Sequence, residues 1–142
     1  SGNHSRGDIY RAVLEGIALE QVMMTDGVAA ATQAIDHIVV MGGGAQSDLW
    51  CQIVADAGSR DVRRLETVEA SSLGAAMAAA KGAGWFKSIP AASESMSGKP
   101  SRTFRPRARE NKAYRELMAV YRDLWPTLSQ WNARLQAISG DT

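Results

Sequence analysis

The sequence has few of the residues that several protein classes depend on. Cys51 is the only cysteine among 142 residues, so no disulfide can form within the chain, and we predict a reducing, cytoplasmic environment. His4 and His37 are the only histidines, too few to indicate a Ser-His-Asp triad or a histidine metal site. Because no run of about 18 apolar residues is present, we expect no membrane-spanning helix and no membrane partner.

The residues that are present describe one globular domain. Hydrophobic residues make up 45% and charged residues 22% of the chain. At this length a folded chain buries roughly two thirds of its unfolded surface, enough for one core but not for two full domains. The first residues, Ser1-Gly2-Asn3, contain neither an initiator Met nor an apolar signal core. We therefore expect the chain to be part of a longer protein.

The net charge of +1 hides an asymmetry along the chain. Residues 1–98 carry 7 basic and 11 acidic side chains, whereas residues 99–142 carry 9 and 4. A basic run of this kind either binds a phosphate-rich partner or forms a solvated surface. Only Phe104 and Tyr114 lie within its dense part, too few aromatics for base stacking. We favour the solvated surface and predict no nucleic-acid partner.

The first half of the chain alternates between helix and strand patterns. A helical pattern runs from Asp8, a possible N-cap, to about Ala34, with Asp26-Gly27 as a possible break. The apolar run 37–41 predicts a buried strand that stops at three glycines. Ser47 is expected to cap a helix that ends at Gly58.

A second strand and two more helices are expected beyond that point. Residues 61–66 predict a weaker strand, and residues 73–81 an alanine-rich helix packed closely against neighbouring backbone. Residues 87–109 resemble a surface loop or arm, and residues 110–138 a C-terminal helix kinked or split near Pro126. Apolar Trp125, Leu128 and Trp131 suggest a possible homodimer.

This order predicts an α/β fold with two parallel strands joined by a helical crossover. Two strands alone would leave both sheet edges without a partner, which is unfavourable in a buried sheet. We therefore expect further strands that precede Ser1 in a longer protein.

The segment from Gly42 to Asp48 is the strongest candidate site. A strand that runs into glycines and then a helix N-terminus can offer bare backbone amides to an anion or a nucleotide. No Lys-Ser/Thr pair follows, so a Walker P-loop is absent. The spacing Gly42-x-Gly44-x-x-Ser47, with Glu66 after the next strand, leaves open a dinucleotide-binding half-domain of an oxidoreductase. A non-catalytic binding module based on the basic run is a third possibility.

Three segments in order resemble the FGGY carbohydrate kinases. Residues 8–15 (DIYRAVLE) are similar to part of their C-terminal signature, residues 42–56 (GGGAQSDLWCQIVAD) to their adenosine-binding segment, and residues 69–76 with 84–85 to the segment that follows. The resemblance implies the C-terminal lobe of an actin-like ATPase, of the ribonuclease H-like fold, spanning residues 1–142. It implies ATP and Mg²⁺ as cofactors and, in its xylulokinase-like form, ATP-dependent phosphorylation of a sugar or polyol hydroxyl.

The resemblance also implies roles for individual residues. Gly42, Gly43, Gly44 and Ala45 would face the adenosine and α-phosphate of ATP, with Ser47 and Asp48 beside the adenine. Gln52, Asp56, Leu73 and Gly74 would hold helices to the sheet. The catalytic Asp is expected before Ser1, and the sugar would bind mainly to a missing N-terminal lobe, so we expect no catalytic and no metal-binding residue here. This chain alone should be inactive as a kinase.

Overall fold

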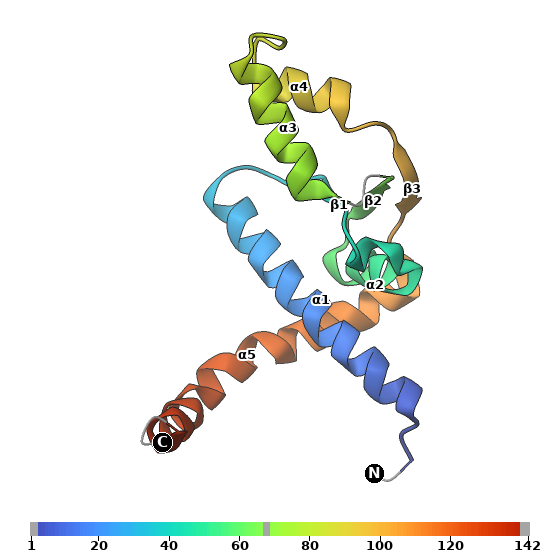
Figure 1. Cartoon of the computed structure of the whole chain (residues 1–142). Coiled ribbons are helices and arrows are strands. Elements are labelled where there is room, and N and C mark those ends of the chain that lie inside the picture. The colour runs from blue at the N-terminus through green and yellow to red at the C-terminus, as the bar shows by residue number, and fades with distance from the viewer. Residues whose placement is uncertain (1–2, 67–68, 140–142) are drawn as a thin grey trace.

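The structure, a computed structural model, describes residues 3–66 and 69–139. Its strands form one three-stranded sheet in the order β1-β2-β3, and its two longest helices cross beside α2 (Figure 1). The elements in chain order are α1 (Arg6–Ala31), β1 (His37–Val40), a 3-10 turn (Gly44–Gln46), α2 (Asp48–Gly58), β2 (Asp61–Leu65), α3 (Ala70–Gly82), α4 (Ile89–Met96), β3 (Pro100–Phe104) and α5 (Ala108–Ser139). Among the described residues no helix is both long and apolar enough to span a membrane.

The expected parallel pair is present, with an additional strand beside it. β1 pairs with β2 in parallel, with His37 opposite Asp61, and α2 forms the crossover between them. β3 pairs with β2 in the antiparallel direction and covers one of the edges expected to be open. The expectation of a loop or arm over residues 87–109 is therefore wrong for two of its parts, α4 and β3.

The sequence pattern of β3 explains why it was missed. Four of its five residues are exposed and only Phe104 is buried, so no alternation of apolar and polar residues marks it. Its pairing with β2 rests on backbone hydrogen bonds, which leave no signature in side-chain hydropathy. α4 is short, with Ser88 as its N-cap and a proline in its first turn.

Each end of α1 differs from the expectation. Ser5, not Asp8, is the N-cap, and its hydroxyl accepts a hydrogen bond from the Asp8 amide at 3.2 Å while Asp8 bonds back to the Ser5 amide at 2.8 Å. This capping box starts the helix three residues earlier than a cap at Asp8 would. The helix continues through Asp26-Gly27 to Ala31, because one glycine costs a helix only about 1 kcal/mol.

The later helices also depart from the pattern. The alanine-rich α3 buries only Met77 and Ala80 and contacts α4, so close packing against backbone on every face is wrong. The expectation that Leu73 and Gly74 hold this helix to the sheet is not supported, since the extensive contacts of α3 are with α4. α5 runs unbroken through Pro126, so the expected split does not occur. Leu128 and Trp131 are exposed, the side chain of Trp125 lies outside the described part, and self-association stays a prediction.

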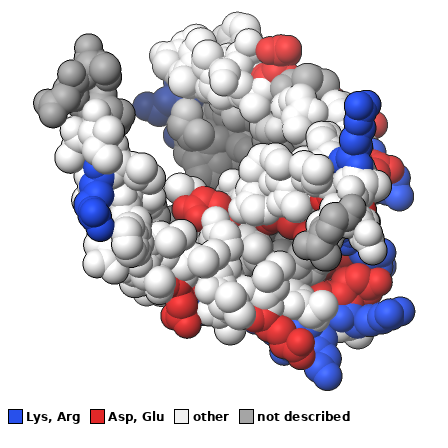
Figure 2. Space-filling view, turned by 90° about the horizontal axis from the view of Figure 1, so that it is seen from below, with Lys and Arg blue, Asp and Glu red and all other residues white. Residues whose placement is uncertain are grey.

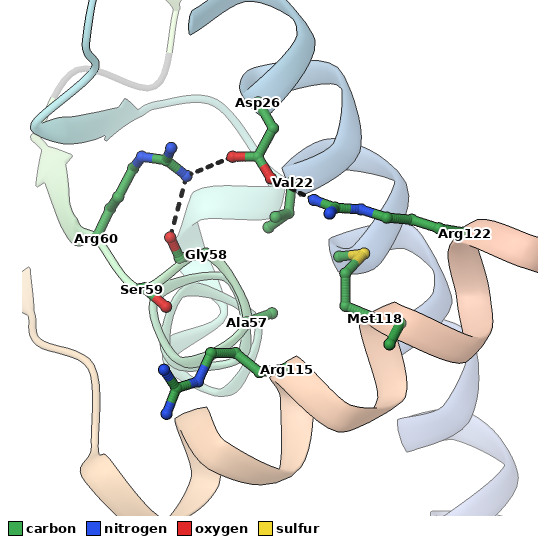
Figure 3. A pocket seen from close by; sticks show the side chains of 10 residues that line it. Val22, Asp26, Ala57, Gly58, Ser59, Arg60, Arg115, Met118 and Arg122 are labelled. Atoms are coloured by element: carbon green, nitrogen blue, oxygen red, sulfur yellow. Dashed lines mark hydrogen bonds and ion pairs between the residues drawn. The ribbon is translucent and has the colours of Figure 1, made fainter. Parts of the chain in front are cut away.

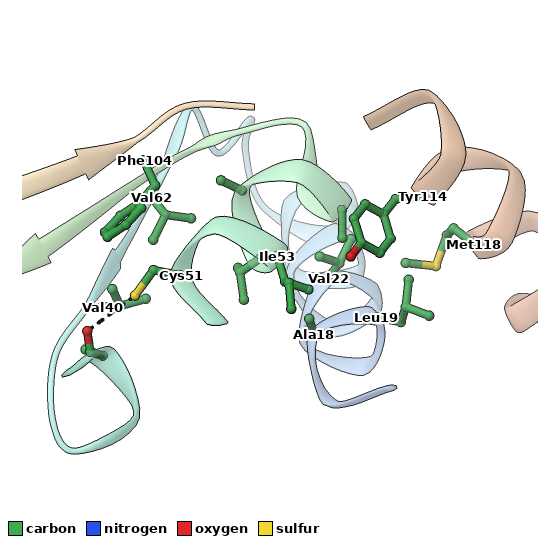
Figure 4. Packing of buried hydrophobic residues seen from close by; sticks show 14 residues of the cluster. Ala18, Leu19, Val22, Val40, Cys51, Ile53, Val62, Phe104, Tyr114 and Met118 are labelled. Carbon is green, nitrogen blue, oxygen red and sulfur yellow. Dashed lines mark hydrogen bonds between the residues drawn. The ribbon is translucent and has the colours of Figure 1, made fainter. Parts of the chain in front are cut away.

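The core lies on both sides of α2 (Figure 4). Toward the sheet, Cys51 packs among residues of β1, β2 and β3, including Val62 and Phe104. Toward the long helices, Ile53 packs among residues of α1 and α5. Each fully buried side chain of this kind contributes about 1.5–3 kcal/mol. α2 is thus the central element of the domain, and both of its ends are held in place.

Candidate functional site

The glycine loop, Gly42 to Ser47, joins β1 to α2. Gly42 has φ of 88°, a left-handed conformation that favours glycine. Gly43 has φ −60° and ψ −42°, which any residue adopts. A Cβ atom placed on Gly43 or Gly44 would meet nothing within 4 Å. The packing of the described chain therefore leaves room beside these two positions, and glycine there lets a ligand approach the backbone closely.

The loop consumes part of its own hydrogen-bonding capacity. The amides of Ala45, Gln46 and Ser47 donate to the carbonyls three residues earlier, at 3.2, 3.1 and 3.2 Å. The expectation of a continuous row of bare amides is therefore wrong, because a 3-10 turn forms there and Ala45 is buried. The hydrogen bonds within the described residues include none from the amides of Gly43 and Gly44. These two donors remain available to a ligand.

Ser47 begins α2, as expected. Its hydroxyl oxygen accepts a hydrogen bond from the Trp50 amide at 3.2 Å, and its carbonyl accepts one from the Cys51 amide at 3.0 Å. Burial raises the pKa of the Cys51 thiol, which donates to the Ala45 carbonyl at 3.4 Å. A contact between Ser47 and an adenine ring would therefore use the hydroxyl hydrogen or the remaining lone pair of the hydroxyl oxygen.

Asp48 has a different environment from the expected one. Its carboxylate pairs with Arg64 of β2 at 2.7 Å and with Arg102 of β3. Arg64 also donates to the Ala45 carbonyl at 3.2 Å, so it links the glycine loop to the start of α2. Both guanidinium groups lie over the Phe104 ring, 5.6 and 4.8 Å from its centre. Asp48 is thus linked to the loop through Arg64, and Arg102 is a second cation on the same carboxylate.

The two arginines were not singled out from the sequence. Arg102 was included only in a basic run expected to be solvated, and Arg64 lies in a strand with no motif of its own. The sequence offers only a weak signal, the adjacent arginines Arg63-Arg64 and an acidic residue, Asp48, at the start of a helix. The contact of Arg64 and Arg102 with Asp48 depends on the β2–β3 register, in which Arg64 lies opposite Arg102.

Two hollows adjoin the glycine loop. The larger, of about 440 Å³, lies between Tyr10, Leu14 and Ile17 of α1 and the loop residues Gly43, Gly44 and Ser47. The smaller, of about 270 Å³, lies along β1, and both are lined by Gly44 and Trp50. Mostly apolar walls with a few polar groups are typical of sites for flat organic ligands. Asp48 and Ala45 do not line the larger hollow.

The other predicted residues lie apart from this loop or serve packing. Asp56 is fully buried and accepts hydrogen bonds from Gln52 at 3.0 Å and from the Arg107 side chain at 2.6 Å, so Gln52 and Asp56 hold α2 to the segment before α5. No group of three or more His, Cys, Asp or Glu side chains within residues 3–66 and 69–139 could hold a metal ion.

Comparison with known proteins gives consistent matches. The C-terminal domain of the FGGY family of carbohydrate kinases matches residues 1–83. The chain is 34% identical over 139 residues to a xylulose kinase of Staphylococcus epidermidis and 31% identical over 136 residues to one of Bacillus subtilis. These alignments cover 98% and 96% of this chain but only 28% and 27% of the two relatives.

The fold matches in the same way. The crystal structure of xylulose kinase from Rhodospirillum rubrum superposes with a TM-score of 0.77 at 27% identity, covering 92% of this chain and 26% of that one. The chain thus spans about a quarter of the length of the proteins that it resembles.

Proposed function

The chain belongs to the FGGY family of carbohydrate kinases, and we propose that it provides the adenosine-binding wall of a longer kinase that transfers phosphate from ATP to a sugar or polyol hydroxyl. Its actin-like α/β fold agrees with that of the family. The names of the S. epidermidis and B. subtilis relatives support xylulose as the sugar. The residues of this chain do not distinguish one sugar from another, because the hollow beside the loop is proposed to hold the nucleotide and not the sugar.

One observation carries this proposal. Gly43 and Gly44 offer two amides without acceptors, above a space where a Cβ atom would meet no neighbour. The adjoining hollow of about 440 Å³ has an apolar wall from α1 and Trp50. A purine ring would lie against this wall while the two amides donate to ribose or phosphate oxygens. Position and hydrogen bonding are the main protein contributions to phosphoryl transfer.

The charge at the start of α2 also suits a phosphate. Asp48 alone would repel an anion, but Arg64 and Arg102 pair with it and leave a local charge of +1. The amino end of a helix adds about half a positive charge. Because Arg64 is held by Asp48 and the Ala45 carbonyl, we propose that it positions the loop without touching the nucleotide.

We propose that the remaining chemistry belongs to other parts of the longer kinase. Mg²⁺, which the family implies, neutralises phosphate charge when bound. The described residues offer no cluster of ligands for it, and the nearest carboxylate to the loop, Asp48, is paired with two arginines. The base that accepts the sugar proton is likewise proposed to lie outside this chain. The domain then binds and orients ATP but does not itself catalyse.

Titration of the chain with ATP-Mg²⁺ tests the proposal. We expect a dissociation constant in the millimolar range, because few donors act without the rest of the kinase. Gly43→Ala should weaken binding at least about tenfold, since the methyl group enters space reserved for the ligand. Gly27→Ala is the matched control, because that glycine also has no neighbour within 4 Å but lies on α1.

The outcomes separate the candidate functions. Equal ATP binding by the wild type, Gly43→Ala and Gly27→Ala would remove the loop from the proposal. Tighter binding of NADH than of ATP-Mg²⁺ would favour the oxidoreductase alternative, which family membership does not support. On the face shown in Figure 2, acidic and basic side chains are interspersed, so this view adds no support for a module that binds nucleic acid.

A further inference from the structure

A separate hollow of about 420 Å³ lies at the carboxyl end of α2, away from the glycine loop (Figure 3). α1 contributes Val22 and Asp26 to its wall, and α5 contributes Arg115, Met118 and Arg122. Arg60, which follows α2, completes the ring of charged groups. Neither family membership nor the proposed nucleotide site assigns a role to this hollow.

The charges around the hollow do not balance. Asp26 pairs with Arg60 and with Arg122, each at 2.9 Å. Arg115 has no hydrogen bond, ion pair or ring contact with any other described residue. Three guanidinium groups and one carboxylate leave a net charge of +2 on the lining. A hollow with this charge attracts a small anion.

The arginines differ in how many donors they keep free. Arg60 is a structural link, since its Nε and Nη1 also donate to the carbonyls of Ile35 at 2.9 Å and Gly58 at 3.0 Å. Arg122 uses one guanidinium nitrogen, on Asp26. Each guanidinium has five N–H donors, so Arg122 and Arg115 retain most of theirs. Asp26 therefore fixes Arg122 at the rim without exhausting it.

The carboxyl end of a helix would ordinarily disfavour an anion. Here two of the carbonyls concerned are already covered, Gly58 by Arg60 at 3.0 Å and Asp56 by the Asn111 side chain at 2.6 Å. The apolar part of the wall includes Val22 and Met118, which are only 3% and 6% exposed. The hollow thus combines a cationic rim with an apolar floor.

We propose that this hollow binds a small organic phosphate monoester. The guanidinium fork matches phosphate oxygens, and a doubly charged phosphate balances the charge of +2. The carbon skeleton of the ligand would lie against Val22 and Met118. The volume of about 420 Å³ falls within the range of small-molecule sites, about 300–1,000 Å³.

Titration of the chain with glycerol phosphate, inorganic phosphate and acetate at low ionic strength tests this site, with amide chemical shifts as the readout. We expect glycerol phosphate to bind in the millimolar range, more tightly than acetate, and to shift the amides around Val22 and Met118. Arg115→Gln should weaken binding about tenfold, the effect of one lost hydrogen bond to a charged group. Arg109→Gln, on the same helix but outside the hollow, should leave binding unchanged within about twofold.

A gain of negative charge provides a second test that does not remove an arginine. Ala119 lines the hollow and is exposed, so Ala119→Glu places a carboxylate one helical turn from Arg115. We expect this variant to lose phosphate binding, whereas Ala113→Glu, exposed on α5 outside the hollow, should retain it.

Three results would overturn the proposal. These are no shift at any ligand concentration up to about 50 mM, shifts confined to the glycine loop, and equal losses for Arg115→Gln and Arg109→Gln, which would mean attraction by overall charge alone. The nucleotide proposal would survive each of them, because it is tested with ATP and with Gly43→Ala.

Discussion

The two ends of α2 both combine a carboxylate, arginine side chains and backbone polar groups, but they differ in which of these groups lack a hydrogen-bond partner. At the amino end, a serine cap and a carboxylate paired with two arginines surround a loop whose glycine amides have no acceptor among the described residues. At the carboxyl end, a buried carboxylate and two helix carbonyls accept hydrogen bonds from side chains outside the helix, those of Arg107, Arg60 and Asn111. The amino end is open to the proposed nucleotide, whereas the polar groups at the carboxyl end join α2 to the rest of the domain. The phosphate proposed beside that end would contact the arginines around the hollow and not these groups.

This difference separates stability from nucleotide binding within one helix. Changes at the carboxyl end should unfold the domain, because they expose or isolate buried polar groups. Changes in the glycine loop should alter ligand affinity with little effect on folding, because a side chain there meets open space. The predictions below test this separation, from the largest expected change in the free energy of unfolding to the smallest.

Arg107→Met should cause the largest loss. The Asp56 carboxylate is completely buried, and the Arg107 side chain donates to it from two nitrogens at 2.6 and 3.1 Å. Removal of the cation leaves a buried charge with Gln52 and one backbone amide, at a cost of about 3 kcal/mol. Urea denaturation measures this, and Arg109→Met, which removes an arginine of the same segment outside these contacts, is the control. Equal midpoints for the two variants would contradict the role of the carboxyl end.

Alkaline pH should cause the next largest loss, through Tyr114. Burial, followed by its hydrogen bond to Glu15 at 2.8 Å, raises the pKa of this hydroxyl from 10.0 to about 12. The folded state therefore retains a proton that the unfolded state releases between these values. The associated stability is complete below pH 10 and declines as the pH rises toward 12, by at most about 2–3 kcal/mol.

Tyr114→Phe isolates that effect. The variant should be less stable than the wild type at pH 8, because it lacks the hydroxyl that donates to Glu15. Its free energy of unfolding should decline less steeply above pH 10. Tyr121, whose pKa is also raised by partial burial and by Glu20, contributes in the same direction and remains in the variant. Urea midpoints at pH 8 and 11 give the slope for each protein. An identical slope in both proteins would show that Tyr114 does not join α5 to α1 in the way described.

The predictability of α2 from sequence contrasts with that of its neighbours. Ser47 is confirmed as the N-cap and Gly58 as the last residue of the helix, although the residue that adopts the left-handed conformation at this end is Ser59. The start of α1 was missed because a capping box needs the serine and the acid to be considered together, and Asp8 alone is a plausible cap. A helix boundary could therefore be predicted from the sequence where a single residue determines it.

Contacts between distant segments could not be predicted in this way. β3 carries no alternating pattern, so neither the third strand nor the partners that it brings to Asp48 could be inferred. The glycine loop was found because its residues are contiguous, but its 3-10 turn, which uses three of its amides, depends on local backbone geometry. The position of the site was therefore predictable, and its hydrogen-bonding capacity was not.

Ser47→Ala should cost about 1 kcal/mol, the usual value of a helix N-cap. The Trp50 amide, now paired at 3.2 Å, would lose its acceptor within the chain. Asparagine caps a helix about as well as serine, so Ser47→Asn should restore most of the loss. Thermal or urea denaturation of the three proteins measures this. Similar stability of the alanine and asparagine variants would mean that the hydroxyl does not act as the cap.

Substitution of one glycine at each end of α2 should give the smallest difference and the most direct comparison. A Cβ atom on Gly58 would lie 3.3 Å from Cγ2 of Val22, which is buried and cannot easily move, whereas one on Gly44 would meet nothing within 4 Å. In Gly58→Ala the gain of alanine in a helix, about 1 kcal/mol, is opposed by overpacking of about 1–3 kcal/mol, so we expect a net loss near 1 kcal/mol or less. Gly44→Ala should change the stability by less than about 0.5 kcal/mol while it weakens ATP binding. If Gly58→Ala instead weakened ATP binding and Gly44→Ala unfolded the domain, the division of the helix into a nucleotide-binding end and a structural end would be wrong, because the two methyl groups probe those ends with the same chemical change.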